Sequence, residues 1–154
     1  MSPEMDHWLY LGSAVLTHAV VGAALAELVD GPAALGALAG VLPDVDLLFP
    51  RTWPFPFDHR GLTHTPAFAL AVVVAVALVA RGRRTDAAVV AGLGLGSHLV
   101  IDTFTASGVM WRYPLSVSAI GVAAGVHGVT YDPVFWVMAA VTVAWVRRGD
   151  GRGR

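Results

Sequence analysis

The fold class is decided by residues Leu62–Ala80, which read LTHTPAFALAVVVAVALVA. This stretch contains no Asp, Glu, Lys or Arg, and His64 is its only ionisable side chain. About 20 predominantly apolar residues in a helix are long enough to cross the hydrocarbon core of a bilayer. The stretch therefore predicts a membrane-spanning α-helix.

The composition of the whole chain supports the same fold class. Of its 154 residues, 56% are apolar and 14% are charged, against about 25% charged residues in a typical soluble domain. The net charge of −1 offers no basic surface for nucleic acid, and the apolar content excludes a disordered chain. We therefore predict a single integral membrane domain over residues 1–154, folded as an all-α polytopic helical bundle.

Five apolar segments predict the spans of this bundle. The second is the shortest, because its helix from Pro32 should end at Leu42-Pro43. The first follows an acidic N-terminus that lacks the basic start of a signal peptide, so it should stay in the mature protein. The predicted spans cover about residues 8–28, 32–48, 62–80, 87–103 and 133–146.

The uncharged stretch from Tyr113 to Tyr131 could be a sixth span or a re-entrant or interfacial segment. Arginines decide between these interpretations, because cytoplasmic loops are enriched in positive charge. With five spans, the clusters at residues 81–84 and 147–154 fall on one side of the membrane, and with six they fall on opposite sides. We therefore predict five spans plus a re-entrant or interfacial segment in the cell membrane, with the N-terminus outside and the C-terminus in the cytoplasm.

Small residues are concentrated in two stretches, at 36–40 and 92–96. Glycine and alanine at a helix surface allow two backbones to approach closely. The second stretch could be mistaken for a nucleotide-binding loop, but no strand precedes it and no Lys-Ser/Thr follows it. Both stretches therefore predict close helix contacts.

Ionisable side chains occur inside the predicted spans, where they are costly and usually functional. His98 and Asp102 are four residues apart and share a helix face, so they can reach one ion together. Imidazole nitrogen and carboxylate oxygen suit zinc or manganese, and the chain has no cysteine that could provide a thiolate. A hydrogen bond between the two side chains is the alternative, although an unpaired carboxylate in this apolar run would be expensive.

Estimates of depth link this pair to polar groups in other spans. With a rise of about 1.5 Å per residue, His18, Asp44 and His98 should lie roughly 15–18 Å from the same membrane face, and Asp102 and His64 about 24–25 Å. All of them fall in one slab between the middle of the membrane and its outer leaflet. Taken singly, each has a simpler interpretation, because a lone histidine often makes an interhelical hydrogen bond and an aspartate often caps a helix.

His59 and His64 are five residues apart and cannot share a helix face, so a common site would require a bend at Arg60-Gly61. His64 is the better candidate ligand, while His59 could orient a ligand or carry protons. Arg60 could hold a phosphate through its guanidinium or anchor the chain at the membrane interface. His127 is predicted to lie in a loop without a functional role.

Four motifs occur in a definite order along the chain. They are Thr17-His18, Leu42-Pro43-Asp44-x-Asp46, His59-Arg60-Gly61-x-Thr63-His64-Thr65 and Gly96-Ser97-His98-x-x-x-Asp102. With Pro114 further on, this order resembles that of the YdjM-like (LexA-regulated) family of predicted membrane-bound metal-dependent hydrolases. That family is distantly similar to zinc-dependent phospholipase C and P1-type nucleases, all-helical enzymes that cleave phosphodiesters with a cluster of zinc ions.

The resemblance implies a divalent metal site, with zinc as the expected ion. The ligands would be His18, Asp44, His64, His98 and Asp102. We predict catalytic roles for Asp46, as a base or a further ligand, for His59, and for Arg60, which would neutralise charge on a phosphoryl group. The chain has no second His-x-x-x-Glu helix, so one or two ions are expected instead of a cluster of three.

The leading hypothesis is therefore a membrane-embedded metal-dependent hydrolase of the phosphoric ester class. A site in the outer half of the bilayer favours a phosphodiester or pyrophosphate bond of a lipid-linked substrate, so the expected partner is membrane lipid. The alternative is a membrane protein that binds or transports metal ions or protons without hydrolysis. A structural subunit is a third hypothesis, and it predicts that the His and Asp side chains point to different neighbours.

Overall fold

The computed structural model describes residues 3–128 and 130–150, and these form an all-helical bundle without a β-strand. The prediction of an all-α fold is confirmed. An isolated antiparallel bridge joins Val109 to Ile120 in the last long loop. The helices are α1 (Pro3–Glu27), α2 (Ala33–Val41), α3 (Pro66–Val79), α4 (Arg84–Thr103) and α5 (Asp132–Asp150), and the 3-10 turns are η1 (Leu42–Leu48) and η2 (Leu62–His64).

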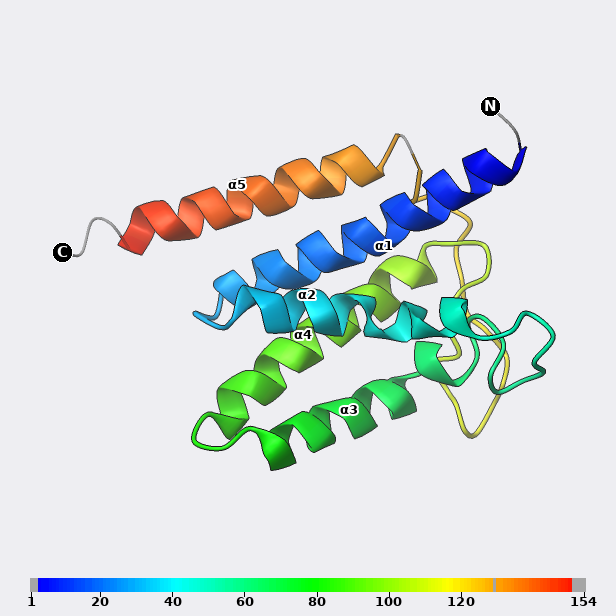
Figure 1. Ribbon diagram of the computed structural model, residues 1–154, viewed down its shortest axis with the longest axis horizontal. Coiled ribbons are helices and arrows are strands. Elements are labelled where there is room, and N and C mark those ends of the chain that lie inside the picture. The colour runs from blue at the N-terminus through cyan, green and yellow to red at the C-terminus, as the bar shows by residue number, and fades with distance from the viewer. Residues whose placement is uncertain (1–2, 129, 151–154) are drawn as a thin grey trace.

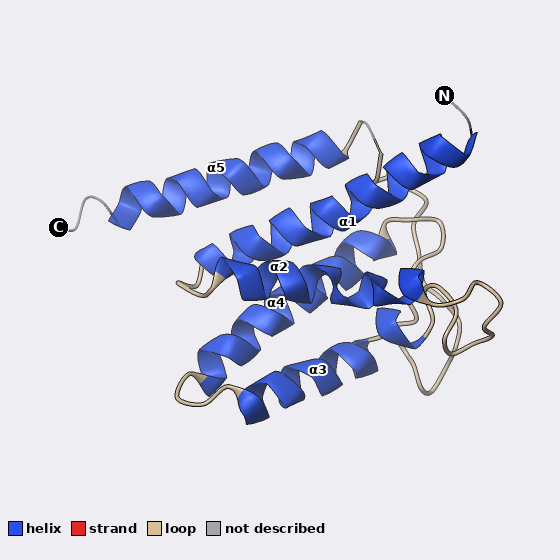
Figure 2. Cartoon of the chain, in the orientation of Figure 1, coloured by secondary structure: helices blue, strands red, loops and turns tan. Residues whose placement is uncertain are grey.

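The helices pack as a bundle around α1 and α4 (Figure 1). Helix α1 contacts α2, α4 and α5, while α3 contacts α4. The two long loops, at residues 49–61 and 104–131, lie at the end of the bundle that also carries the N-terminus (Figure 2). The α3–α4 turn and the C-terminal end of α5 lie at the opposite end (Figure 1). The arginines at 81–84 therefore lie at the same end of the bundle as Arg147 and Arg148 in the last turn of α5.

Small residues bring α1, α2 and α4 into backbone contact. A Cβ atom added at Gly40 would collide with the carbonyl oxygen of His18, and one at Gly36 would collide with that of Gly22. A Cβ at Gly94 would lie 2.7 Å from the carbonyl oxygen of Gly36. The predicted close contacts are confirmed for the 36–40 stretch and, in the 92–96 stretch, at Gly94.

Prolines set the end of α2, as predicted, and the start of α3, which is later than predicted. Helix α2 gives way at Pro43 to the 3-10 turn η1. The predicted helix at 62–80 is wrong at its start, because α3 begins only at Pro66, with the Thr65 hydroxyl accepting from the Phe68 N–H at 3.1 Å. Proline disfavours the helical conformation at the residue before it, and Thr65 is extended. Because neither η1 nor η2 continues as an α-helix, the polar side chains of both turns can point into the bundle.

One helix is long and apolar enough to cross a membrane by length and composition alone, at Glu4–Glu27. Helix α3 is apolar throughout but has 14 residues, and α2 has nine. They rise about 21 and 14 Å, less than the roughly 30 Å of a hydrocarbon core. The predicted bundle of five spans is therefore not confirmed. Among the described residues between 104 and 131 there is no helix, so this stretch does not form a sixth helical span.

Apolar side chains nevertheless cover much of the outer surface of the bundle. Every residue of α3 is apolar, yet none of its side chains is fully buried. Leu70, Leu78 and Val79 are each more than 60% exposed, and Val137 and Val141 on α5 are exposed to the same degree. A helix that is apolar on all sides requires apolar surroundings, which a single chain in water does not provide here.

Candidate metal centre

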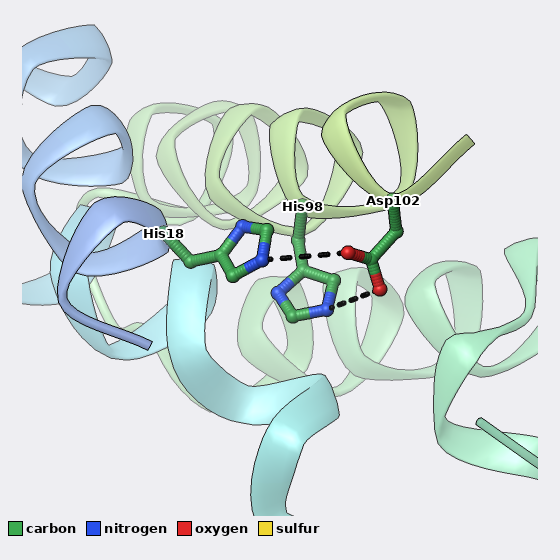
Figure 3. A group of neighbouring side chains, drawn as sticks. All are labelled: His18, His98 and Asp102. Atoms are coloured by element: carbon green, nitrogen blue, oxygen red, sulfur yellow. Dashed lines mark ion pairs between the residues drawn. The ribbon is translucent and has the colours of Figure 1, made fainter. Parts of the chain in front are cut away.

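The structure brings together all of the side chains predicted as metal ligands. They come from different elements, with His18 on α1, Asp44 on η1, His64 on η2, and His98 and Asp102 on α4. The close contact of α1 with α2 and α4 brings His18 on α1 next to His98 and Asp102 on α4. Figure 3 shows His18 and His98 pointing toward the carboxylate of Asp102. The convergence argues against the hypothesis that these side chains are independent structural features.

Asp102 lies at the centre of the cluster and is 1% exposed. Its Oδ2 atom is 3.4 Å from Nε2 of His64 and 3.4 Å from Nε2 of His98. Its Oδ1 atom is 3.6 Å from Nε2 of His18. Asp44 closes the group from η1, with Oδ1 at 3.5 Å from Nε2 of His64 and at 3.8 Å from Nε2 of His98.

Hydrogen bonds on the far side of two imidazoles fix which ring nitrogen carries the hydrogen. Nδ1 of His98 donates to the carbonyl oxygen of Gly40 at 2.7 Å. Nδ1 of His64 lies 3.1 Å from the Thr63 hydroxyl oxygen, whose own hydrogen goes to Asp46 Oδ2, and 3.0 Å from that carboxylate oxygen. A carbonyl or carboxylate oxygen only accepts, so the hydrogen lies on Nδ1 in each neutral ring. The lone pairs on Nε2 therefore point toward Asp102, as they do in histidines oriented to bind a metal. His18 differs, because its buried Nδ1 has no hydrogen-bond partner in the described chain.

Several buried polar atoms at the centre form no hydrogen bond within the described residues, although Arg60 Nη2 lies 3.1 Å from Asp102 Oδ1. Nε2 of His64, Nε2 of His98 and both carboxylate oxygens of Asp102 lack a hydrogen-bond partner within the described residues. A buried polar atom without a partner costs about 1–3 kcal/mol, and more when it is charged. A cation between the two Nε2 lone pairs and Asp102 Oδ2 would satisfy three of these atoms at once.

The spacing of the donor atoms fits a divalent ion. In a tetrahedral zinc site with bonds of about 2.0–2.1 Å, neighbouring ligand atoms lie about 3.3–3.4 Å apart. The distances from Asp102 Oδ2 to His64 and His98 match this separation, and those from Asp44 are slightly longer. His18, His98 and Asp102 form one group that could hold an ion, and Asp44, His64 and His98 form another. The donor set thus fits the metal that the sequence predicts.

Asp46 has a different environment from the one predicted for a base or a ligand. Its Oδ2 atom accepts from the Arg60 N–H at 2.9 Å and from the Thr63 hydroxyl at 2.8 Å, besides facing His64. Its Oδ1 atom accepts from Nδ1 of His59 at 2.8 Å. Although Asp46, His59 and His64 lie close enough to form a third possible metal group, protein donors already occupy both oxygens. The geometry favours a positioning role for Asp46 over the predicted catalytic one.

The predicted bend at Arg60-Gly61 is confirmed. Arg60 has a φ of 67°, and a Cβ atom at Gly61 would collide with the carbonyl oxygen of Pro56. The bend turns the Arg60 guanidinium toward the cluster, where Nη2 lies 3.1 Å from Asp102 Oδ1 and Nη1 donates to the Thr105 hydroxyl at 2.8 Å. A non-glycine residue in the left-handed region is often held there by functional constraints.

A cavity of about 270 Å³ opens beside this arginine. The His59 ring, 41% exposed, lines the cavity and has its Nε2 atom free, because Nδ1 is bound to Asp46. Arg60, His18 and Asp102 line the same cavity. The cluster is therefore accessible to a small polar group on the side where the predicted catalytic residues lie.

His127 belongs to the cluster, contrary to the prediction. Its Nε2 atom lies 3.5 Å from Asp102 Oδ1, and its Nδ1 atom donates to Asp132 Oδ1 at 3.2 Å. Burial lowers the pKa of His127, but the carboxylates of Asp102 and Asp132 raise it by more, so that the net shift is upward. The sequence signal was weak: a histidine and an aspartate five residues apart in a glycine-rich stretch without helical periodicity.

Comparison with known proteins gives one family. The family described as YdjM inner membrane protein matches the chain over residues 14–153. The comparisons with curated proteins and with solved structures gave no match. The distant likeness to phospholipase C and P1 nuclease therefore stays a prediction from the motifs.

Proposed function

The chain belongs to the YdjM inner membrane protein family, and we propose that it is a membrane-embedded, metal-dependent hydrolase of a lipid-linked phosphodiester or pyrophosphate. Family membership supports location in the membrane. The number of spans, the orientation, the metal and the reaction are parts of the proposal. The exposed apolar residues of α3 and α5 support contact of these helices with lipid.

One observation carries the proposal: the Nε2 lone pairs of His64 and His98 and the buried Oδ2 atom of Asp102 converge on a point that no hydrogen-bond donor of the described chain faces. We assign Asp44, His64, His98 and Asp102 Oδ2 as ligands of a divalent ion, with His18 on the other oxygen of Asp102. A divalent ion held at this cluster would lower the pKa of a bound water and polarise a phosphoryl oxygen. Asp46 holds the His64 ring in the orientation that this role requires.

The residues around the cavity supply the remaining functions of a phosphoryl hydrolase. Arg60 presents a guanidinium to the cavity, where it can bind phosphoryl oxygens that approach Asp102. Hydrolysis adds water across a P–O bond, so one proton leaves the water and one reaches the departing oxygen. His59 can carry one of these protons on its free Nε2, since Asp46 fixes its other nitrogen.

An apolar groove supports a lipid as the substrate. The groove has a volume of about 590 Å³ and is lined by aliphatic side chains of α1, α2, η1, α3 and α4, with Asp44 as its only charged residue. Val15, Asp44 and Leu47 line both this groove and the polar cavity, so the two are adjacent. A hydrocarbon chain in the groove would place its phosphorylated end at the metal ligands.

The test is hydrolysis by the purified full-length chain in detergent. The substrates are a polyprenyl diphosphate and a diacylglycerol phosphodiester in mixed micelles, and a water-soluble nitrophenyl phosphodiester serves as the comparison. We expect zinc-dependent hydrolysis of at least one lipid and much slower hydrolysis of the soluble ester. The groove variant Val76→Trp should lose lipid hydrolysis while retaining its zinc, whereas Val134→Trp on the exposed face of α5 should retain both.

Two results would contradict the proposal. Wild-type protein that binds no zinc would remove its basis. Protein that binds zinc, hydrolyses none of these esters, and carries zinc into proteoliposomes would instead support the alternative of a metal carrier.

A further inference from the structure

We propose that Asp102 bridges two metal ions and that His127 is a ligand of the second. The inference rests on the proposed metal centre, to which it adds a second ion position and a ligand from the 104–131 loop. The second ion would be held by Asp102 Oδ1, His127 and His18. No motif in the sequence assigns His127 to this site.

The two oxygens of Asp102 face different sets of donors. Oδ2 faces His64 and His98, each at 3.4 Å, and Asp44 completes that side. Oδ1 faces Nε2 of His127 at 3.5 Å and Nε2 of His18 at 3.6 Å. The two sets approach the carboxylate from separate elements, and both have the spacing of neighbouring ligand atoms around a zinc ion. A carboxylate with one donor set at each oxygen is arranged to bridge two ions.

The second set contains its own unsatisfied buried atoms. Nε2 of His127 and Oδ1 of Asp102 have no hydrogen-bond partner in the described part of the chain. Arg60 Nη2 lies 3.1 Å from Oδ1 but makes no hydrogen bond to it, and its other nitrogen is held by Thr105. The ion of the first set, which lies toward Oδ2, would leave His127 Nε2 without a partner. A second ion therefore accounts for atoms that the first does not.

His127 is oriented in the way that metal-binding histidines usually are. Its Nδ1 atom donates to Asp132 Oδ1 at 3.2 Å, which leaves the lone pair of the neutral ring on Nε2. Asp132 in turn accepts from the Gly128 N–H at 2.9 Å and from the Thr17 hydroxyl at 3.0 Å. The side chains of His127 and Asp132 are each 1% exposed, although the histidine lies in a loop. Asp132 is thus a positioning residue, which acts through His127.

The two ion positions differ in their access to the cavity. All three ligands of the second ion, His18, Asp102 and His127, line the polar cavity, whereas among the ligands of the first ion the two carboxylates do and the imidazoles of His64 and His98 do not. The second position has three protein ligands, which leaves one tetrahedral position open, as in catalytic zinc sites. The first has four protein ligands and is closed. We therefore infer that the second ion exchanges faster and that it faces the substrate phosphate beside Arg60.

The test is metal stoichiometry in the full-length protein purified in detergent and equilibrated with buffered zinc. Mass spectrometry of the metal should give two zinc ions per chain for the wild type and one for His127→Ala. Asp132→Asn keeps the size of the side chain but provides a weaker acceptor, and it should lower the affinity for the second ion about 10–100-fold. His7→Ala is the control, since His7 lines the same cavity without facing Asp102, and it should keep both ions.

Cobalt substitution provides a readout that a purely structural effect would not imitate. Two Co²⁺ ions bridged by Asp102 should be magnetically coupled in the wild type, and His127→Ala should show the signal of a single isolated ion. One ion per chain in the wild type, or two in His127→Ala, would overturn the inference while leaving the proposed function intact. Wild-type protein without any metal would overturn both. Far-ultraviolet circular dichroism identifies variants that have lost their helices. If His127→Ala is one of them, the zinc affinity of Asp132→Asn tests the inference in its place.

Discussion

Asp46 and Asp102 lie on opposite edges of one imidazole ring, that of His64, and are satisfied in opposite ways. Both are buried, at 3% and 1% exposure. The oxygens of Asp46 accept from a backbone N–H, a hydroxyl and an imidazole N–H. Those of Asp102 face imidazole Nε2 atoms and, on the Oδ1 side alone, the Arg60 guanidinium at 3.1 Å. The difference separates a carboxylate that stabilises the fold from one that is arranged for a cation.

The largest effect should come from Asp102→Asn. The amide retains one acceptor oxygen but loses the negative charge and one metal-binding atom, so we expect loss of bound zinc and of hydrolysis. Zinc at about 100 times its dissociation constant should stabilise the wild type by about 2.7 kcal/mol. It should not shift the thermal midpoint of the variant. A variant that keeps its zinc would remove the distinction between the two aspartates.

Asp46→Asn should weaken zinc binding without abolishing it. The amide has one acceptor oxygen, so it can accept either from the Arg60 N–H and the Thr63 hydroxyl or from His59, and its NH2 group faces the donor on the other side. We expect this mismatch to cost about 1–3 kcal/mol of stability. The orientation of His64 would be less fixed, which typically lowers metal affinity about 10–100-fold. Thermal unfolding and a zinc titration measure the two effects. Complete loss of zinc in a folded variant would show that Asp46 is itself a ligand.

Arg60→Gln should separate the two halves of the comparison, because the backbone of Arg60 contacts Asp46 and its side chain contacts Asp102. The N–H bond to Asp46 is kept in this variant, so its stability and zinc content should stay close to those of the wild type. Loss of a charged contact to a phosphoryl oxygen should lower kcat/KM at least about tenfold, or about 1.4 kcal/mol. Unchanged hydrolysis would assign Arg60 a role in the fold alone.

The smallest effect should come from Thr63→Val. Valine has nearly the shape of threonine but cannot donate the hydrogen bond to Asp46 Oδ2. We expect a loss of about 1 kcal/mol in stability and a change in zinc affinity of less than about tenfold. Thr142→Val is the matched control, because the Thr142 hydroxyl bonds only the Met138 carbonyl on the surface of α5. A larger loss of zinc affinity in Thr63→Val than in Asp46→Asn would contradict the proposed order of effects.

Local patterns were enough to predict the helices and the central pair of the site. Apolar runs located each α-helix, and the four-residue spacing of His98 and Asp102 placed both on the inner face of α4. The bend at Arg60-Gly61 followed from the spacing of His59 and His64, which are five positions apart. These features depend on residues that are close in the sequence, where periodicity and glycine or proline chemistry act directly.

What the sequence did not predict depends on contacts between distant segments. His127 reaches Asp102 only because the loop after α4 folds back, with Val109 paired to Ile120. The hydroxyl of Thr17 meets Asp132 across most of the chain length. The role of Asp46 depends on donors from the η2 turn, which no spacing within its own motif reveals. The helix predicted at 62–80 was too long at its start because hydropathy continues through Leu62–Thr65, whereas α3 begins only at Pro66.

Zinc-edge X-ray absorption on the purified wild-type protein tests the central claim most directly. We predict a shell of nitrogen and oxygen atoms at about 2.0–2.1 Å, together with the outer-shell scattering of imidazole rings. That imidazole scattering should be lost in Asp102→Asn. An absorption edge no stronger than that of the buffer, or the spectrum of a hydrated ion without imidazole scattering, would contradict the account.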